Sequence, residues 1–261
     1  MKGLNVIKNV FWAFGILVCL VAVAGGLIFG AFTKYSLPEG YEMGMEQEEQ
    51  NAAVGSGILH QLPESADGGQ SYLDSLTFLC DSAMIGLRDY GLITDVGKVW
   101  GSSAGNISVE NIADPTIRYS DGTERTVSQA AEAAKPSVLV ISLGMDSLQK
   151  IKQADFEANY TALINNIRTA SPETKIVVCS LSSVTSGYSS PDGITIEMVS
   201  EAETWIQNVC RSTGVFYADA ASAVKDTSNT LLSDYAGVNN KALNSAGINK
   251  ILEYLRGHIV S

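Results

Sequence analysis

Residues 77–83 read Thr77-Phe78-Leu79-Cys80-Asp81-Ser82-Ala83, and this stretch decides the fold expected for the chain. The apolar pair before Cys80 is typical of the end of a buried strand, and the apolar residues after Ser82 are typical of a helix. A serine at such a strand-to-helix turn exposes its hydroxyl beside unpaired backbone N–H groups, which can stabilise a developing oxyanion. The stretch therefore identifies Ser82 either as a candidate nucleophile or as a simple helix cap.

Beyond this turn, short apolar runs alternate with helical periodicities. The runs predicted to be strands are residues 77–80, 98–100, 137–143, 175–181 and 215–218. Helical faces are predicted from the apolar residues at 156–167, 198–209 and 248–255. Such a βα alternation predicts an α/β domain with a parallel sheet and helices on both faces.

Two local patterns refine this prediction. Asp121-Gly122, between two short β-prone runs, predicts a small surface hairpin. In open parallel sheets, sites lie at the carboxyl ends of the strands. Ser82, Gly105, Gly144 and Asp146 are therefore expected to lie at that edge.

The amino-terminal part differs in character from this domain. The chain has 261 residues and a formal net charge of −11, which suits one domain with appendages. Residues 10–32 carry no charge and are long enough to cross a bilayer as one transmembrane helix. Lys2 and Lys8 precede this run and acidic residues follow it, which predicts cytoplasmic residues 1–9 and an extracellular carboxyl-terminal domain. A cleaved signal peptide is the alternative, since Ala22-Val23-Ala24 resembles a cleavage site.

Residues 33–70 contain seven acidic side chains against one lysine, together with several glycines. This composition predicts a flexible, solvated stalk, with the folded domain at 71–261. The acidic balance excludes a nucleic-acid partner. The cysteines form no disulfide framework or CxxC pair, and no nucleotide fingerprint is present, so neither a metal nor a cofactor is expected.

Taken together, residues 72–258 resemble the SGNH, or GDSL-type, hydrolases, in particular the membrane-anchored extracytoplasmic members. Cys80-Asp81-Ser82 stands where that family has Gly-Asp-Ser, with the serine as nucleophile. Gly105 is placed like the family glycine whose N–H serves the oxyanion hole. Asp146 follows the central strand, where the family has the asparagine that completes the hole. The resemblance implies a flavodoxin-like, three-layer α/β/α domain and ester hydrolysis.

The chain departs from the family pattern at two positions that ester hydrolysis requires, the general base and an oxyanion-hole donor. The family ends with Asp-x-x-His, whose histidine is the general base, but the corresponding position here is Asn239 or, in the register set by Leu243-Asn244, Ala242. Neither side chain can accept the serine proton, and loss of a triad base typically costs on the order of 10⁴ to 10⁶ in kcat. Asp146 has no donor when ionised and repels an oxyanion. His258 is expected to be a solvated terminal residue.

These departures favour a catalytically degenerate domain, retained to bind a cell-wall or exopolysaccharide glycan, as the resemblance suggests, or a partner protein. An active esterase acting on cell-envelope carbohydrate is the alternative, with a carboxylate base drawn from Asp146, Asp192 or Asp234. A purely structural extracellular module is the third.

The three hypotheses predict different surroundings for Ser82. Catalysis predicts a base within hydrogen-bond reach of its hydroxyl. Binding predicts an open polar or aromatic cleft, and a structural role predicts a cleft filled by side chains such as Met145 or Tyr235. Candidate cleft aromatics are Tyr188, Tyr235 and Trp100, and residues 182–193 form a candidate cleft loop.

Overall fold

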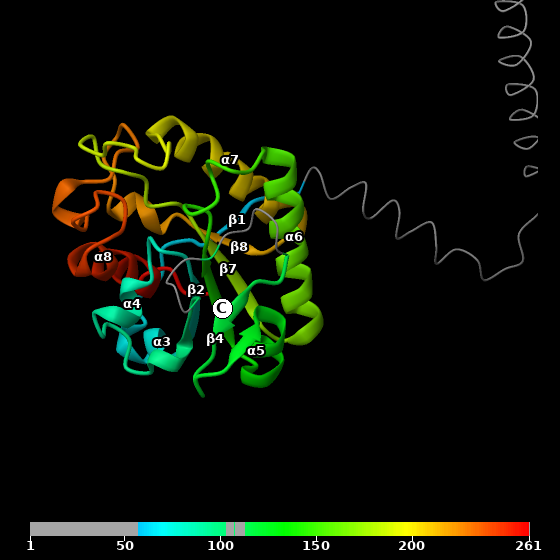
Figure 1. The fold of residues 1–261 in the computed structure, drawn as a ribbon. Helices are drawn as coiled ribbons and strands as arrows, with labels where there is room; N and C mark the ends of the chain where they lie inside the picture. The colour runs from blue at the N-terminus through cyan, green and yellow to red at the C-terminus, as the bar shows by residue number, and fades with distance from the viewer. Residues whose placement is uncertain (1–56, 103–106, 108–112, 261) are drawn as a thin grey trace, which may run out of the picture. The chain divides into compact units, whose positions relative to one another are not determined.

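The computed structural model describes residues 57–102, 107 and 113–260, all within one unit, Ala53–Ser261 (Figure 1). Its centre is a six-stranded sheet in the order β1-β8-β7-β6-β2-β3, and every neighbouring pair is parallel. The strands are β1 (His60–Gln61), β2 (Leu76–Cys80), β3 (Val99–Trp100), β6 (Val138–Ser142), β7 (Lys175–Cys179) and β8 (Phe216–Ala218). The α/β fold with a parallel sheet, predicted from the sequence, is confirmed.

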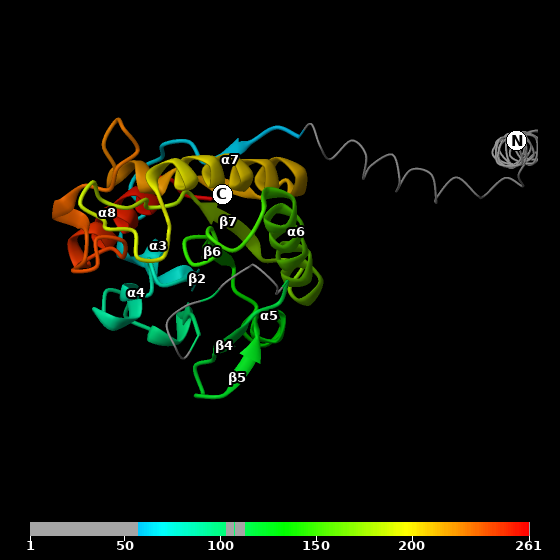
Figure 2. The same cartoon turned by 45° about the horizontal axis from the view of Figure 1, so that its top comes forward.

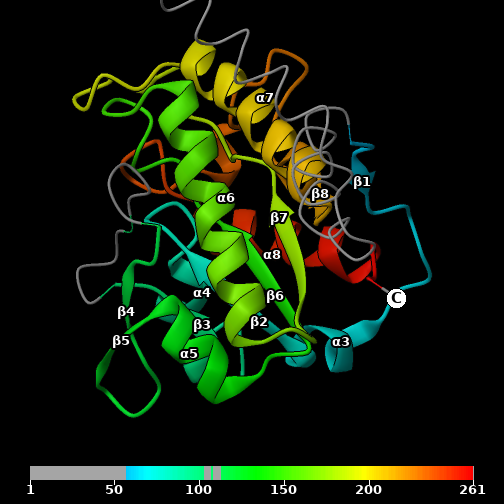
Figure 3. The same cartoon turned by 90° about the vertical axis from the view of Figure 1, so that its right-hand side faces the viewer.

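Helices cover both faces of this sheet, as Figures 1 and 3 show. One face packs against α5 (Val127–Ala134), α6 (Gln153–Ala170) and α7 (Ile196–Thr213), and the other against α3 (Gly69–Ser75), α4 (Gly86–Asp89) and α8 (Ser245–Arg256). Successive strand residues enter opposite cores, because side chains alternate along a strand. Leu139 and Ile141 face α5, α6 and α7, whereas Val138 and Val140 face α8. The domain is therefore a three-layer α/β/α sandwich.

The long helices begin and end where their sequences supply caps. The side chain of Thr195 accepts a hydrogen bond from the Met198 N–H at the start of α7, and Gly214, at φ +66°, ends that helix. Asn244 caps α8 in the same way by accepting from the Gly247 N–H. These caps define both ends of α7 and the amino-terminal end of α8.

The remaining elements are short. Figure 2 shows the hairpin of β4 (Thr116–Arg118) and β5 (Glu124–Thr126) set apart from the main sheet. This antiparallel pair confirms the hairpin predicted around Asp121-Gly122. Three 3₁₀ helices complete the described elements, namely η3 (Val96–Lys98), η4 (Ala220–Ala223) and η5 (Ser233–Tyr235).

The structure corrects the carboxyl-terminal limit of the predicted stalk. Residues from 57 onward do not extend into solvent as part of a stalk at 33–70. β1 pairs with β8 as an edge strand, the Leu62 N–H donates to the Tyr217 carbonyl over 2.8 Å, and the Leu62 side chain is buried. The acidic, glycine-rich composition masked this short strand, because its pairing depends on backbone groups rather than on an apolar run.

The predicted cytoplasmic segment 1–9, the transmembrane helix 10–32 and the stalk up to residue 56 lie outside the described residues. Within residues 57–102, 107 and 113–260, no helix combines the length and the apolar character needed to cross a bilayer.

Candidate active site

Ser82 lies in the turn that joins β2 to α4. The Met84 and Ile85 N–H groups donate to the Asp81 carbonyl over 3.2 and 3.1 Å, which turns the chain sharply after the strand. Helix α4 begins at Gly86, its N-cap is Ile85, and it has no side-chain cap. The hydroxyl of Ser82 is thus not used as the cap of α4 and points to the carboxyl edge of the sheet.

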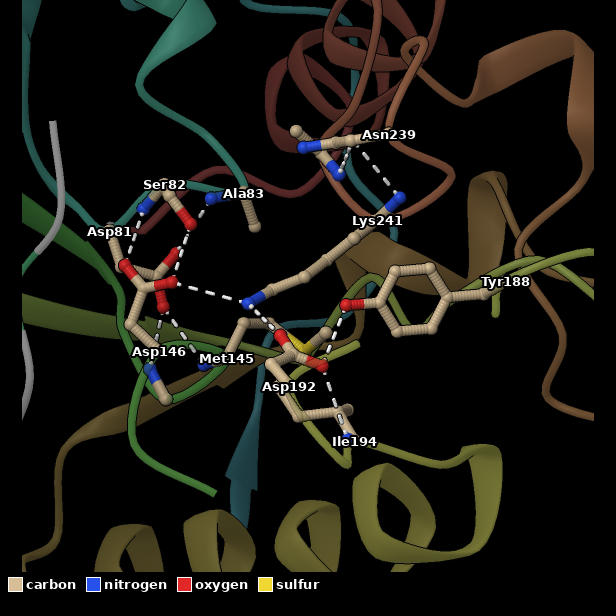
Figure 4. Close-up of polar contacts among 12 residues, drawn as sticks. Asp81, Ser82, Ala83, Met145, Asp146, Tyr188, Asp192, Ile194, Asn239 and Lys241 are labelled. Atoms are coloured by element: carbon tan, nitrogen blue, oxygen red, sulfur yellow. Dashed lines mark hydrogen bonds and ion pairs between the residues drawn. The ribbon is translucent and has the colours of Figure 1, made fainter. Parts of the chain in front are cut away.

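Asp146 holds Ser82 through both of its oxygens (Figure 4). The Ser82 N–H donates to Oδ2 over 3.0 Å, and the Ser82 hydroxyl donates to Oδ1 over 2.5 Å. Asp146 follows β6, which pairs with β2, so adjacent strands deliver the two residues to one edge. An oxyanion formed at this turn would need hydrogen-bond donors such as the Ser82 N–H. The Asp146 carboxylate already accepts that N–H and the Ser82 hydroxyl.

Asp81 lies beneath this pair and is fully buried. Its carboxylate accepts from the N–H groups of Ala83 over 3.1 Å and of Gly144 and Met145 over 2.9 Å each, which joins the turn after β2 to the turn after β6. Burial, and next the nearby Asp146 charge, raise the pKa of Asp81 from 3.8 to about 7, although the backbone N–H groups oppose this rise. Asp81 therefore positions the loop that carries Asp146.

Lys241 completes the site from the segment that joins η5 to α8. Its Nζ lies 3.4 Å from Oδ1 of Asp146 and 3.0 Å from Oδ2 of Asp192, and the Lys241 side chain is only 13% exposed. Asp192 also accepts from the Tyr188 hydroxyl over 2.6 Å and from the Ile194 N–H over 3.2 Å. Burial alone would raise the pKa of Asp192, but the hydrogen bonds from Tyr188 and Lys241 outweigh burial, so its pKa is lowered.

The segment expected to supply the base does lie beside Ser82. The Leu243 N–H donates to the carbonyl of Ala83 over 3.1 Å, which places Ala242 next to the Ser82 turn. Asn239 uses its Oδ1 within its own loop, where it accepts from the N–H groups of Lys241 and Ala242 over 3.1 and 2.9 Å. The geometry therefore favours Ala242 over Asn239 as the position that corresponds to the family base. The side chain of this segment that extends to the Ser82 site is that of Lys241, through Asp146.

Sequence reasoning did not identify Lys241. Its signal was available, since it is the only lysine between residues 226 and 249 and directly precedes Ala242. Of the carboxylates predicted as alternative bases, Asp146 contacts Ser82, Asp192 contacts Lys241, and Asp234 is exposed on η5.

The other residues singled out in the sequence lie in different parts of the chain. Gly105 lies outside the described residues. Trp100 is 1% exposed within the core, so the interpretation as a cleft aromatic was wrong for it. His258 is half-buried rather than solvated: its ring stacks on Tyr254 with centroids 3.7 Å apart, and its Nδ1 lies 2.7 Å from the Tyr254 carbonyl oxygen. Of the proposed cleft aromatics, Tyr188 joins the site through Asp192.

Two further features bear on the hypotheses. Met145, proposed as a cleft filler, is buried, whereas Ser82 is half-buried. A cavity of about 730 Å³ lies at the opposite, amino-terminal edge of the sheet, where Val138 and Lys175 line it. Among the described residues, no group of three or more His, Cys, Asp and Glu side chains is arranged to hold a metal ion.

Comparisons with solved structures give similar folds at low identity. A proposed platelet activating factor from Streptococcus pneumonia is 13% identical with a TM-score of 0.47, covering 90% of this chain and 97% of its own. A peptidoglycan O-acetylesterase is 15% identical with a TM-score of 0.40, covering 49% of this chain and 39% of its own. A carbohydrate esterase family 3 protein from Talaromyces cellulolyticus is 13% identical with a TM-score of 0.40, covering 69% of this chain and 91% of its own.

No curated protein matches the chain. A family model does match, over residues 96–239, which is more than half of the sequence. This match begins after the Ser82 turn and ends at Asn239, so it covers Asp146 but neither Ser82 nor Ala242. On this match, together with the parallel sheet and the turn after β2, the chain belongs to the GDSL-like lipase/acylhydrolase family.

Proposed function

We propose that this chain is a non-hydrolytic member of the GDSL-like family, retained for binding at the cell envelope. The observation that carries the proposal is the contact of the Asp146 carboxylate with both the N–H and the hydroxyl of Ser82. Attack by a serine requires a base for its proton and donors for the oxyanion that forms. Here one carboxylate occupies the only backbone donor of Ser82 and places negative charge where the oxyanion would develop.

Magnitudes favour this reading over hydrolysis. Removing one oxyanion donor costs about 3 kcal/mol, and a like charge at that place costs more. Ala242 supplies no base, a loss of about 10⁴ to 10⁶ in kcat. The two penalties act on the same step, so residual turnover is expected to be negligible.

The binding role includes attachment to a membrane and a position outside the cell. Support comes from the uncharged residues 10–32, from Lys2 and Lys8 before them and from the acidic residues after them. The ligand is proposed to be a cell-wall or exopolysaccharide glycan or a partner protein. The glycan rests on the sequence resemblance to extracytoplasmic GDSL-type hydrolases, which commonly act on acyl or acetyl groups of carbohydrates and lipids.

A second candidate function is esterase activity on cell-envelope carbohydrate. One observation favours it: the Ser82 hydroxyl lies 2.5 Å from Oδ1 of Asp146, within reach for proton transfer to a carboxylate. Such an enzyme would use Asp146 as base, and it would need oxyanion donors other than the Ser82 N–H.

The first prediction separates the two functions by turnover. The full-length chain in detergent is assayed with p-nitrophenyl acetate and with an acetylated glycan, beside Ser82→Ala. We expect no hydrolysis above the Ser82→Ala background, because Asp146 occupies the Ser82 N–H and no histidine of the described residues contacts Ser82. Turnover that disappears in Ser82→Ala would overturn the non-hydrolytic proposal and favour Asp146 as a base.

A repaired variant serves as the positive control. Asp146→Asn with Ala242→His restores an amide donor and an imidazole beside Ser82. This double variant should hydrolyse p-nitrophenyl acetate, and its activity should vanish when Ser82→Ala is added.

A further inference from the structure

Three hydrogen-bond donors converge on the carboxylate of Asp146. They are the N–H of Ser82 at 3.0 Å, the hydroxyl of Ser82 at 2.5 Å and Nζ of Lys241 at 3.4 Å. In Figure 4 the Ser82 side chain points to the Asp146 carboxylate from above and the Lys241 side chain from the right. A backbone N–H, a hydroxyl and an ammonium around one carboxylate form the donor set expected of a carboxylate-binding site.

We propose that Ser82 and Lys241 form a receptor for a carboxylate group, and that Asp146 is its built-in ligand. This inference rests on the proposed function of the same site and names the chemistry that the site recognises. An external ligand that uses this site must present a carboxylate that replaces the one on Asp146.

The enclosure of the site supports this assignment. The side chains of Asp146 and Lys241 are 10% and 13% exposed, so their interaction is only weakly screened by solvent. Asp192 holds the ammonium of Lys241 over 3.0 Å by a separate contact, so Lys241 stays in place when Asp146 is removed. Asp81 also faces the site, and its own three backbone N–H bonds do not involve Ser82 N or Lys241.

Two truncations of Asp146 would leave cavities of different size. Asp146→Gly removes a methylene and a carboxylate, which acetate matches, whereas Asp146→Ala removes only the carboxylate, which formate matches. The tethered carboxylate of the wild type acts at a high effective concentration, so free anions should not displace it. The size of the deleted group thus predicts which anion each variant accepts.

The experiment follows thermal unfolding of the full-length chain in detergent by tryptophan fluorescence. Sodium formate or sodium acetate replaces sodium chloride at constant ionic strength. We expect a saturating rise of Tm with formate in both variants, a saturating rise with acetate only in Asp146→Gly, and no saturating rise in the wild type. Adding Lys241→Met to Asp146→Gly should weaken formate binding at least about tenfold, because the ammonium hydrogen bond to an anion is lost.

Each outcome decides the proposal. No saturating response to formate in either variant overturns it, and so does a response that Lys241→Met leaves unchanged. Where a variant is unfolded in chloride, refolding in formate supports the receptor, and failure to refold in both variants overturns it. The readout is binding, not turnover, so hydrolysis by the wild type would refute the proposed function and leave this result standing.

Discussion

At the scale of single residues, the site places the carboxylate of Asp146 beside Ser82 and supplies a counter-charge nearby. The resemblance puts the asparagine of the oxyanion hole at Asp146 and the base at Asn239 or Ala242, and Lys241 directly precedes Ala242. A carboxylate with an exposed fraction of 10% requires hydrogen-bond partners, and Lys241 with the two donors of Ser82 provides them. The charge of Asp146 and the ammonium of Lys241 therefore balance each other beside Ser82.

Asp81 gives a prediction about pH. Its pKa is raised from 3.8 to about 7 by burial and then by the Asp146 charge, so the folded chain keeps a proton that the unfolded chain releases. Stability from this group is full below about pH 4 and is lost as pH rises through about 7. The loss is at most about 4 kcal/mol. Urea unfolding from pH 4.5 to 8 should show this decline in the wild type.

The control for this prediction is Asp81→Asn, which cannot titrate. Its free energy of unfolding should be lower at acidic pH and should lack the part of the slope that Asp81 causes. Equal slopes in the two chains would refute the raised pKa.

Much of the residue-level site could be predicted from sequence, and the failures have a physical cause. Ser82 and Asp146 were placed at the same edge, because each follows a strand of one parallel sheet. The choice between Asn239 and Ala242 stayed open, because it depends on the backbone bond from Leu243 to Ala83, which has no sequence pattern. Lys241 was missed for the same reason. Its contact with Asp146 joins residues that are far apart in the sequence and that only the fold brings together.

At the scale of elements, the loop 182–193 contacts the segment 236–243 at two points. The Thr185 N–H donates to the Asn240 carbonyl over 3.0 Å, and Asp192 pairs with Lys241 over 3.0 Å. The sequence predicted only a loop that could line the cleft. These two contacts connect the loop to the Ser82 site through Lys241.

The ion pair between Asp192 and Lys241 predicts that its loss speeds local hydrogen exchange. Asp192→Asn keeps an acceptor for Tyr188 and Ile194 but removes the charge that attracts Lys241. We expect amides of residues 186–193 to exchange at least about tenfold faster, because a charge-assisted hydrogen bond is lost. Mass spectrometry of deuterium uptake measures this change.

The matched control is Asp226→Asn. Asp226 also accepts two backbone N–H groups, from Ser228 and Thr230, but on a loop without contact to Lys241. Its substitution should alter uptake only around its own turn. Unchanged uptake at 186–193 in Asp192→Asn would contradict the role of the ion pair.

The elements themselves were predicted well where packing decides them. Apolar runs fixed the strands around Leu79, Ile141 and Val178, because strands covered on both faces require continuous apolar residues. β1 was missed because it has only two residues and both are exposed. An edge strand of this kind depends on backbone pairing, which composition does not reveal.

At the scale of the whole molecule, the sequence predicts a chain divided between a membrane and the space outside it. The full-length chain, expressed in bacteria, should remain with the membrane fraction after alkaline carbonate extraction, because the uncharged residues 10–32 are expected to span the bilayer. A chain beginning at residue 53 should be released. Protease added to intact spheroplasts should digest the carboxyl-terminal domain, as the positive-inside rule requires. A full-length chain extracted by carbonate would refute the anchor.

The mutual satisfaction of Asp146, Lys241 and Asp192 also constrains how this lineage can change. Replacing Asp146 alone removes one of the two carboxylates that hold the ammonium, and replacing Lys241 alone leaves the largely buried Asp146 and the partly exposed Asp192 without this cation. Each of these single substitutions leaves a charge with one partner fewer, so the three positions are expected to change together rather than one at a time.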